Sequence, residues 1–159
     1  MSGKSLRIVQ AGEAGKVRHR LRILIADDDR DTTLLLGAIL RDEGDEVHVA
    51  LRGDEVLDIV RLFRPDAVVL DINMPGMSGY GIAHEIRERY HNLSPLLIAM
   101  SGVWTSASDR LAGKELGFDH YLVKPSDPQH LLALLEPLRS GQSKSAGGEQ
   151  SARGRGPPD

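Results

Sequence analysis

The chain has 159 residues, the length of one ordinary domain, and its 40% hydrophobic content is enough for one buried core. It contains no cysteine, which excludes disulfides, thiolate metal sites and cysteine nucleophiles and suits a cytoplasmic location. The net charge of −3 is uneven, because residues 23–138 carry ten Lys or Arg and twenty acids, whereas residues 1–22 carry six bases and one Glu. So acidic a centre argues against direct DNA binding and could instead hold a cation. No apolar run reaches the roughly 18 residues needed to span a bilayer, so we expect no membrane association.

The two ends of the chain differ from its centre. Residues 1–21 are basic and weakly periodic, which predicts a flexible basic arm, with residues 6–9 as a candidate for local order. Residues 140–159 are rich in Gly, Ser and Pro and cannot bury enough apolar surface to offset the entropy of ordering, so we expect a disordered tail. Residues 22–139 remain as one folded domain.

Five short apolar runs within this domain have the length and composition of strands. Most are continuous, as in strands that are buried on both faces, and one alternates between apolar and polar residues. The predicted strands are residues 22–26, 46–50, 67–70, 96–100 and 120–123.

Amphipathic segments between and after these runs are predicted helices. Asp54 and Asp127 stand at positions typical of N-caps, and Gly44 and Gly117 follow two of the segments. Regular alternation of strands and helices predicts an α/β fold: a doubly wound, five-stranded parallel sheet with helices on both faces. The predicted helices are residues 32–43, 54–63, 79–90, 106–116 and 127–138.

Polar side chains stand at the carboxyl ends of the predicted strands, where open α/β sheets bind their ligands. Close carboxylates repel one another, and a divalent cation relieves this repulsion. Mg²⁺ (or Mn²⁺) takes one or two carboxylates and keeps several waters, so we predict Asp28 and Asp71 as direct ligands and Asp27 as a ligand through water. The strand-end residues are Asp27, Asp28, Asp29, Asp71, Ser101 and Lys124.

A strand-end carboxylate can also attack phosphorus and form an acyl phosphate. Asp71 is the predicted phosphoacceptor. The metal and the Lys124 ammonium would then stabilise the phosphoryl oxygens by charge, and the Ser101 hydroxyl would donate a hydrogen bond to them.

Four motifs, in this order along the chain, resemble those of the response-regulator receiver family. The resemblance covers about residues 22–138, and each motif falls at a predicted strand end. The motifs are residues 23–29, 66–79, 99–102 and 117–125.

The resemblance implies a flavodoxin-like fold of strand order 2-1-3-4-5 and a two-component phosphorelay role. A histidine kinase or histidine phosphotransfer protein would phosphorylate Asp71, and the chain would be a signalling phosphoacceptor that catalyses only its own phosphorylation and dephosphorylation. The backbone carbonyl of Asn73 becomes a metal ligand, and Ser101 and Tyr121 become switch residues. The peptide bond between Lys124 and Pro125 is commonly cis in such domains.

The resemblance also points to positions that tune dephosphorylation and to a surface for partners. Asn73 and Val103 are the tuning positions, and apolar Val103 cannot orient water, so we expect a long-lived phosphoryl group. A downstream protein, or a second copy in a homodimer, would bind the face formed by residues 106–116, 120–123 and 127–138.

Several alternatives stay open at this point. The chain could be a single-domain response regulator, since residues 140–159 are too few for a DNA-binding domain, or the excised receiver of a hybrid histidine kinase. It could also be a phosphorylation-independent pseudo-receiver scaffold, although such proteins usually lose one of the key residues. A haloacid-dehalogenase-like hydrolase is disfavoured, because Asn73 stands where a second Asp would act as general acid.

Overall fold

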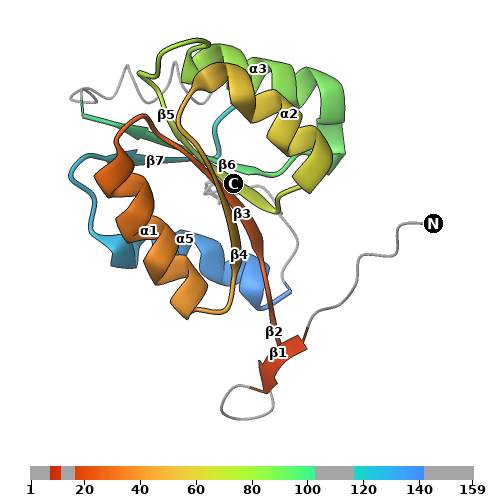
Figure 1. The fold of residues 1–159 in the computed structure, drawn as a ribbon. Helices are drawn as coiled ribbons and strands as arrows, with labels where there is room; N and C mark the ends of the chain where they lie inside the picture. The colour runs from red at the N-terminus through yellow and green to blue at the C-terminus, as the bar shows by residue number, and fades with distance from the viewer. Residues whose placement is uncertain (1–7, 12–16, 103–116, 142–159) are drawn as a thin grey trace, which may run out of the picture.

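The computed structural model of the chain describes residues 8–11, 17–102 and 117–141, and its centre is a five-stranded parallel sheet (Figure 1). The strands lie side by side in the order β4-β3-β5-β6-β7. Counted from β3, this is the order 2-1-3-4-5, so the expected topology is confirmed. The strands are β3 (Arg22–Ala26), β4 (Glu46–Ala50), β5 (Ala67–Asp71), β6 (Leu96–Ser101) and β7 (His120–Val123).

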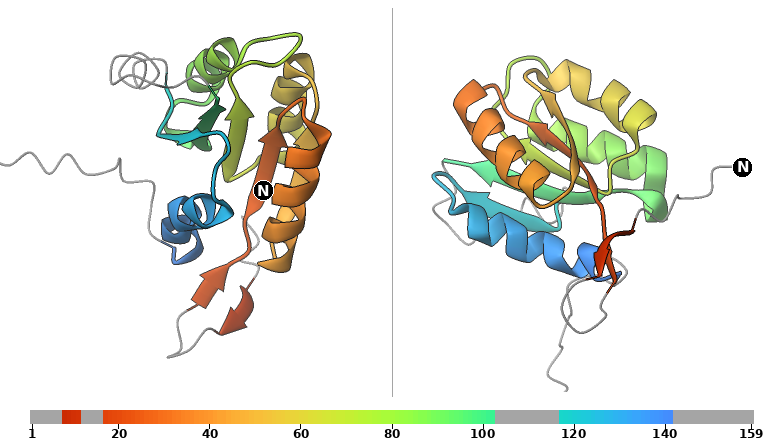
Figure 2. Two further views of the ribbon diagram at one scale, coloured as in Figure 1. Left: turned by 90° about the vertical axis from the view of Figure 1, so that its left-hand side faces the viewer. Right: turned by 60° about the horizontal axis from the view of Figure 1, so that its bottom comes forward.

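Helices cover both faces of this sheet and complete a three-layer molecule (Figures 1 and 2). The helices α1 (Arg30–Asp42) and α5 (Pro128–Arg139) pack on one face, and α2 (Gly53–Phe63) and α3 (Gly79–Tyr90) pack on the other. Side chains alternate across the central strand β5, with Val68 and Leu70 in the α2–α3 core. The doubly wound architecture is thus the predicted one.

The helix ends agree with the sequence expectation in part. The Asp127 side chain accepts a hydrogen bond from Gln129 N, so its predicted role as the N-cap of α5 is confirmed. The prediction for Asp54 is wrong, because α2 already begins at Gly53 and its N-cap is Arg52. Asp54 lies in the first turn and pairs instead with the Arg52 side chain. The predicted helix at residues 106–116 lies outside the described residues.

The part of residues 1–21 that the structure describes contains two short strands. β1 (Ile8–Ala11) and β2 (Val17–His19) pair in an antiparallel manner, and β2 leads through Leu21 into β3. This hairpin lies at the amino-terminal end of β3 (Figure 1). One side chain ties it to the helices, because Arg18 Nη2 lies 3.1 Å from a carboxylate oxygen of Glu136 on α5. Residues 142–159 of the predicted tail lie beyond the described part.

A buried ion pair closes the same end of the domain. Asp45 lies in the turn before β4, and both of its carboxylate oxygens accept hydrogen bonds from Arg139, the last residue of α5. Asp45 also accepts a hydrogen bond from the backbone N–H of Leu21 at 3.1 Å. The side chains of Asp45 and Arg139 are 0% and 2% exposed. Three segments that are distant in sequence therefore meet at this pair.

Candidate functional site

The carboxyl ends of β3 and β5 bring three acidic side chains together. The two strands are neighbours with Ala26 opposite Leu70, so the residues that follow, Asp27 and Asp71, stand next to each other. One carboxylate oxygen from each of Asp27, Asp28 and Asp71 lies within 4.8 Å of the others. Asp27 and Asp71 are buried, whereas Asp28 is exposed. The cluster that the sequence predicts is present.

The consecutive acids after β3 have different environments. Asp27 Oδ1 accepts a hydrogen bond from Asp29 N at 2.9 Å, which turns the chain sharply after the strand. Asp29 then serves as the N-cap of α1 and accepts hydrogen bonds from Asp31 N and Thr32 Oγ1. The hydrogen bond from Thr32 is the main reason that the pKa of Asp29 is lowered. Asp29 thus starts a helix, and Asp27 and Asp28 face the site.

Lys124 connects the two buried carboxylates. Its ammonium nitrogen lies 2.6 Å from Asp27 Oδ2 and 3.2 Å from Asp71 Oδ2. The backbone places this side chain, because Lys124 N donates to Ser101 O at 2.9 Å. The bond between Lys124 and Pro125 is cis, as the resemblance implied. The predicted lysine therefore lies in direct contact with the predicted phosphoacceptor.

Burial and charge oppose one another in this cluster. Burial, followed by the neighbouring Asp27 charge, raises the pKa of Asp71 above its usual value, although Asn73 N–H and Lys124 act in the opposite direction. Burial alone would lower the pKa of Lys124, but the hydrogen bond and charge of Asp27, with the charge of Asp71, raise it. Lys124 is thus held as a cation, while Asp71 is not fully compensated.

The donor set fits a hard divalent cation. Three carboxylate groups offer oxygen ligands, one of them on the exposed side, and one lysine is shared between the two buried acids. A second positive charge would relieve the burial that opposes ionisation of Asp71. The residues present are therefore suited to hold Mg²⁺ or Mn²⁺.

The loop of residues 72–78 closes the site on the side of α3. Asn73 N donates to Asp71 Oδ1 at 3.1 Å, which places the Asn73 backbone beside the predicted phosphoacceptor. The loop returns at Gly79, whose N–H donates to Ile72 O, and a Cβ at Gly79 would lie only 2.8 Å from Asp71 O. The role of Gly79 was not predicted from the sequence, although its position after the N-cap Ser78 was a usable signal.

The two predicted switch residues stand on β6 and β7. Ser101 ends β6 and is 2% exposed. Tyr121 is half-buried in β7, where its ring packs edge-on against Phe118 with centroids 5.9 Å apart. Burial raises the pKa of Tyr121 to about 12. Val103, predicted to tune dephosphorylation, lies outside the described residues. Residues 106–116 also lie outside them, so only β7 and α5 of the predicted partner-binding face are described.

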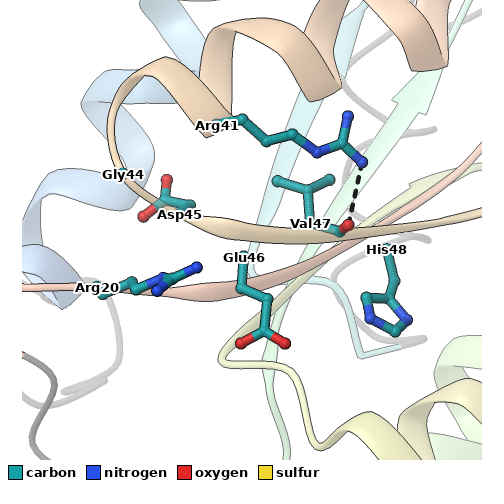
Figure 3. A pocket seen from close by; sticks show the side chains of 7 residues that line it. All are labelled: Arg20, Arg41, Gly44, Asp45, Glu46, Val47 and His48. Atoms are coloured by element: carbon teal, nitrogen blue, oxygen red, sulfur yellow. Dashed lines mark hydrogen bonds between the residues drawn. The ribbon is translucent and has the colours of Figure 1, made fainter.

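A pocket of about 530 Å³ lies elsewhere, at the amino-terminal end of β4 (Figure 3). Two of its lining residues are joined by a hydrogen bond, since Arg41 Nη2 donates to Val47 O at 3.1 Å. The Asp45 carboxylate in its lining is already engaged by Arg139. None of the predicted site residues that the structure describes lines this pocket. The lining residues are Arg20, Arg41, Gly44, Asp45, Glu46, Val47 and His48.

Together the fold and the cluster define a flavodoxin-like α/β domain with an acidic site at the carboxyl ends of its strands. The family model for the response regulator receiver domain matches residues 23–136. The chain belongs to this family, which confirms the resemblance seen in the sequence.

Individual relatives agree with this assignment. The chain is 38% identical over 120 residues to the probable transcriptional regulator ycf27 of Cyanophora paradoxa, covering 76% of this chain and 48% of the relative. It is 37% identical over 132 residues to the response regulator MprA of Mycolicibacterium vanbaalenii, covering 83% of this chain and 56% of the relative. The chain thus spans about half the length of the curated relatives it matches.

A solved structure extends the likeness to three dimensions. The chemotaxis response regulator CheY4 of Vibrio cholerae superimposes with a TM-score of 0.69 and 28% identity, covering 75% of this chain and 98% of that one. Within the described part of our chain, none of the helices combines the length and the apolar character that crossing a membrane requires.

Proposed function

We propose that this chain is a two-component receiver that accepts a phosphoryl group on Asp71 from a histidine kinase or histidine phosphotransfer protein. The observation that carries the proposal is the placement of Lys124, whose ammonium contacts both Asp27 and Asp71 at the strand ends. This lysine can pair with Asp71 before the reaction and with phosphoryl oxygens afterwards. Membership of the receiver family supports the same role.

In the proposed reaction, a carboxylate oxygen of ionised Asp71 forms a bond to phosphorus while the bond from phosphorus to the donor nitrogen breaks. The side chains of Asp28 and Asp71 and the Asn73 carbonyl would hold Mg²⁺ or Mn²⁺, with Asp27 contributing through water. When bound, the metal supplies positive charge against the developing phosphoryl charge. Lys124, whose ammonium contacts both Asp27 and Asp71, provides a second positive charge.

The phosphoryl group would act as a switch. It adds roughly −1.5 to −2 charge at the end of β5, and the Ser101 hydroxyl can donate a hydrogen bond to it. Movement of Ser101 would give the Tyr121 ring space to turn inward, which changes the surface near β7 and α5. A downstream protein or a second copy of the chain would bind the changed surface, because phosphorylation favours one of two existing states.

The receiver itself would be a signalling phosphoacceptor rather than an enzyme acting on a separate substrate. The relative ycf27 of Cyanophora paradoxa is named as a probable transcriptional regulator. For our chain we propose that phosphorylation controls transcription indirectly, without contact between this chain and DNA, because residues 23–138 carry twenty acids against ten bases.

Exchanging apolar Val103 for Glu should shorten the lifetime of the phosphoryl group, as measured from its loss over time.

The proposal is tested by incubating the full chain with Mg²⁺ and acetyl phosphate and measuring its intact mass. We expect a gain of one phosphoryl group that requires Mg²⁺ and is absent from Asp71→Asn. Asp58→Asn is a matched control, since Asp58 is an exposed aspartate on α2. A chain that gains no phosphoryl group, either from acetyl phosphate or from phosphorylated histidine kinases, would instead be a phosphorylation-independent scaffold.

A further inference from the structure

The amino-terminal end of α2 packs directly against the loop that follows the phosphoacceptor strand. Gly53 N donates to Pro75 O at 3.0 Å. A Cβ built at Gly53 would lie 1.9 Å from Met77 O and 2.8 Å from Met77 N and C. Real Cβ atoms essentially never approach a neighbour closer than 3.0 Å. The present position of the loop therefore requires glycine at position 53.

The contact is also tight from the side of the loop, although less so than at Gly53. Gly76 has a φ of +92°, and a Cβ there would lie 3.1 Å from Asp54 Oδ1 and 3.2 Å from Asp54 N. Two consecutive residues of α2 thus face the backbone of residues 75–77. Backbone atoms can relieve such a contact only if one whole segment moves.

Of the two segments, the middle of the loop is the less firmly anchored, although Ile72 and Met74 near its start are buried. Helix α2 is anchored in the core by Val56, Val60 and Phe63, which are 0%, 2% and 6% exposed. Pro75 and Gly76 in the loop are exposed. A methyl group at position 53 would displace Met77 O by about 1 Å, the difference between 1.9 Å and the 3.0 Å limit.

The same loop belongs to the acidic site. It begins with Asn73, whose N–H donates to Asp71 Oδ1, and it ends at Gly79, whose N–H donates to Ile72 O. A shift of its middle therefore acts on the backbone of Asn73, beside the phosphoacceptor. Side chains that orient a metal site from outside are worth roughly 10–100-fold in metal affinity, and a backbone seat can act in the same way.

We propose that Gly53 is a positioning residue for the acidic site. By having no side chain, it lets the loop of residues 72–78 lie against α2, and this seat sets the place of the Asn73 backbone relative to Asp71. The inference rests on the proposed function, since it concerns binding of the divalent cation and phosphorylation at that site. Gly53 itself is neither a proposed ligand of the cation nor a residue that reacts with the phosphoryl group.

The test measures Mg²⁺ affinity of the full chain by titration calorimetry, and separately the Mg²⁺ dependence of phosphorylation by acetyl phosphate. We expect Gly53→Ala to raise the Mg²⁺ concentration for half-saturation about tenfold in both measurements. The maximal phosphorylation rate at saturating Mg²⁺ should fall less, because the reacting groups remain. A role in folding alone would lower the melting temperature without moving the Mg²⁺ dependence.

Gly81→Ala is the matched control. A Cβ at Gly81 would meet the end of the Met77 side chain at 3.2 Å, and this flexible group can yield without moving the loop backbone. Gly76→Ala is the second variant, because a residue with a Cβ is strained at a φ of +92° and its Cβ would also press on Asp54 N, so the same loop shifts from an exposed position. It tests the positioning role if Gly53→Ala does not fold. We expect Gly81→Ala to match the wild type, and Gly76→Ala to weaken Mg²⁺ binding.

The outcomes separate this inference from the proposed function. Wild-type Mg²⁺ dependence in Gly53→Ala and Gly76→Ala, with normal phosphorylation of the wild type, overturns the positioning role alone. If Gly53→Ala does not fold, wild-type dependence in Gly76→Ala is sufficient to overturn it. A wild-type chain that binds Mg²⁺ but gains no phosphoryl group contradicts the proposed function. In that case weaker Mg²⁺ binding by Gly53→Ala and Gly76→Ala still supports the positioning role of Gly53. A wild-type chain that does not bind Mg²⁺ overturns both.

Discussion

At the scale of single residues, Asp71 combines a reactive position with an unfavourable environment. Its carboxylate is buried beside Asp27, and burial is the main reason that its pKa is raised above the ordinary aspartate value of 3.8. The folded state therefore holds the Asp71 proton more tightly than the unfolded state does. The stability gained from this tighter proton binding is fully present below pH 3.8 and is lost as pH rises through the folded-state pKa of Asp71.

It follows that Asp71→Asn should stabilise the fold near neutral pH in the absence of Mg²⁺. The amide carries no charge, so it avoids the cost of an ionised, buried carboxylate. The advantage over the wild type should shrink as pH falls towards 3.8, where Asp71 in the folded state is protonated. Urea unfolding of both proteins across this pH range measures the effect. An advantage that did not change with pH would contradict the assignment, and Asp58→Asn controls for loss of a surface charge.

At the scale of elements, the ends of the helices show how local signals meet tertiary demands. Helix α2 ends at Phe63, and its C-cap Arg64 has the left-handed conformation with a φ of 50°. Pro65 comes next and cannot continue the helix, so the end itself was readable from the sequence. The conformation of Arg64 was not, because glycine is the residue usually found at such a position.

Arg64→Gly should therefore raise the free energy of unfolding by about 1 kcal/mol, since a left-handed conformation costs a residue with a Cβ about that much. Arg61→Gly is the matched control, because Arg61 is an exposed arginine in the last turn of the same helix. Glycine inside a helix costs about 1 kcal/mol relative to alanine, so the control should be destabilised. Denaturant unfolding compares the two, and loss of stability in both would refute the explanation.

At the scale of the whole molecule, one buried ion pair joins the turn before β4 to the last residue of α5. Asp45 and Arg139 are separated by 94 positions in the sequence, and Asp45 also holds the backbone N–H of Leu21 before β3. Removing one partner leaves the other charge buried without compensation. The attraction between the two charges therefore contributes little net stability, whereas removing one of them costs much stability.

We expect Asp45→Ala to lower the free energy of unfolding by about 3–5 kcal/mol. Asp58→Ala removes one partner of the exposed Asp58–Arg61 pair, so it should cost at most about 1 kcal/mol. Urea unfolding of the two variants against the wild type gives both values. A similar small effect at both positions would show that Asp45 is not an essential anchor.

The alternation of apolar runs and amphipathic segments was enough to predict the parallel sheet and its acidic end, whereas the strand order was implied by the resemblance to the receiver family. Asp27, Asp28, Asp71 and Lys124 follow buried strands, and parallel strands direct their carboxyl ends to one edge, so local pattern and chain direction alone place these side chains together. The same reasoning located the N-cap Asp127, which acts on its own helix.

Only the tertiary structure decided the contacts that no period in the sequence encodes. The hairpin of β1 and β2, the pairing of Asp45 with Arg139, and the seat of Met77 on Gly53 each join segments whose residues look ordinary by themselves. Periodicity reports which face of an element is buried, but it carries no information about which distant group will lie against that face. Such contacts depend on packing between elements, so they become visible only once the sheet and its helices are assembled.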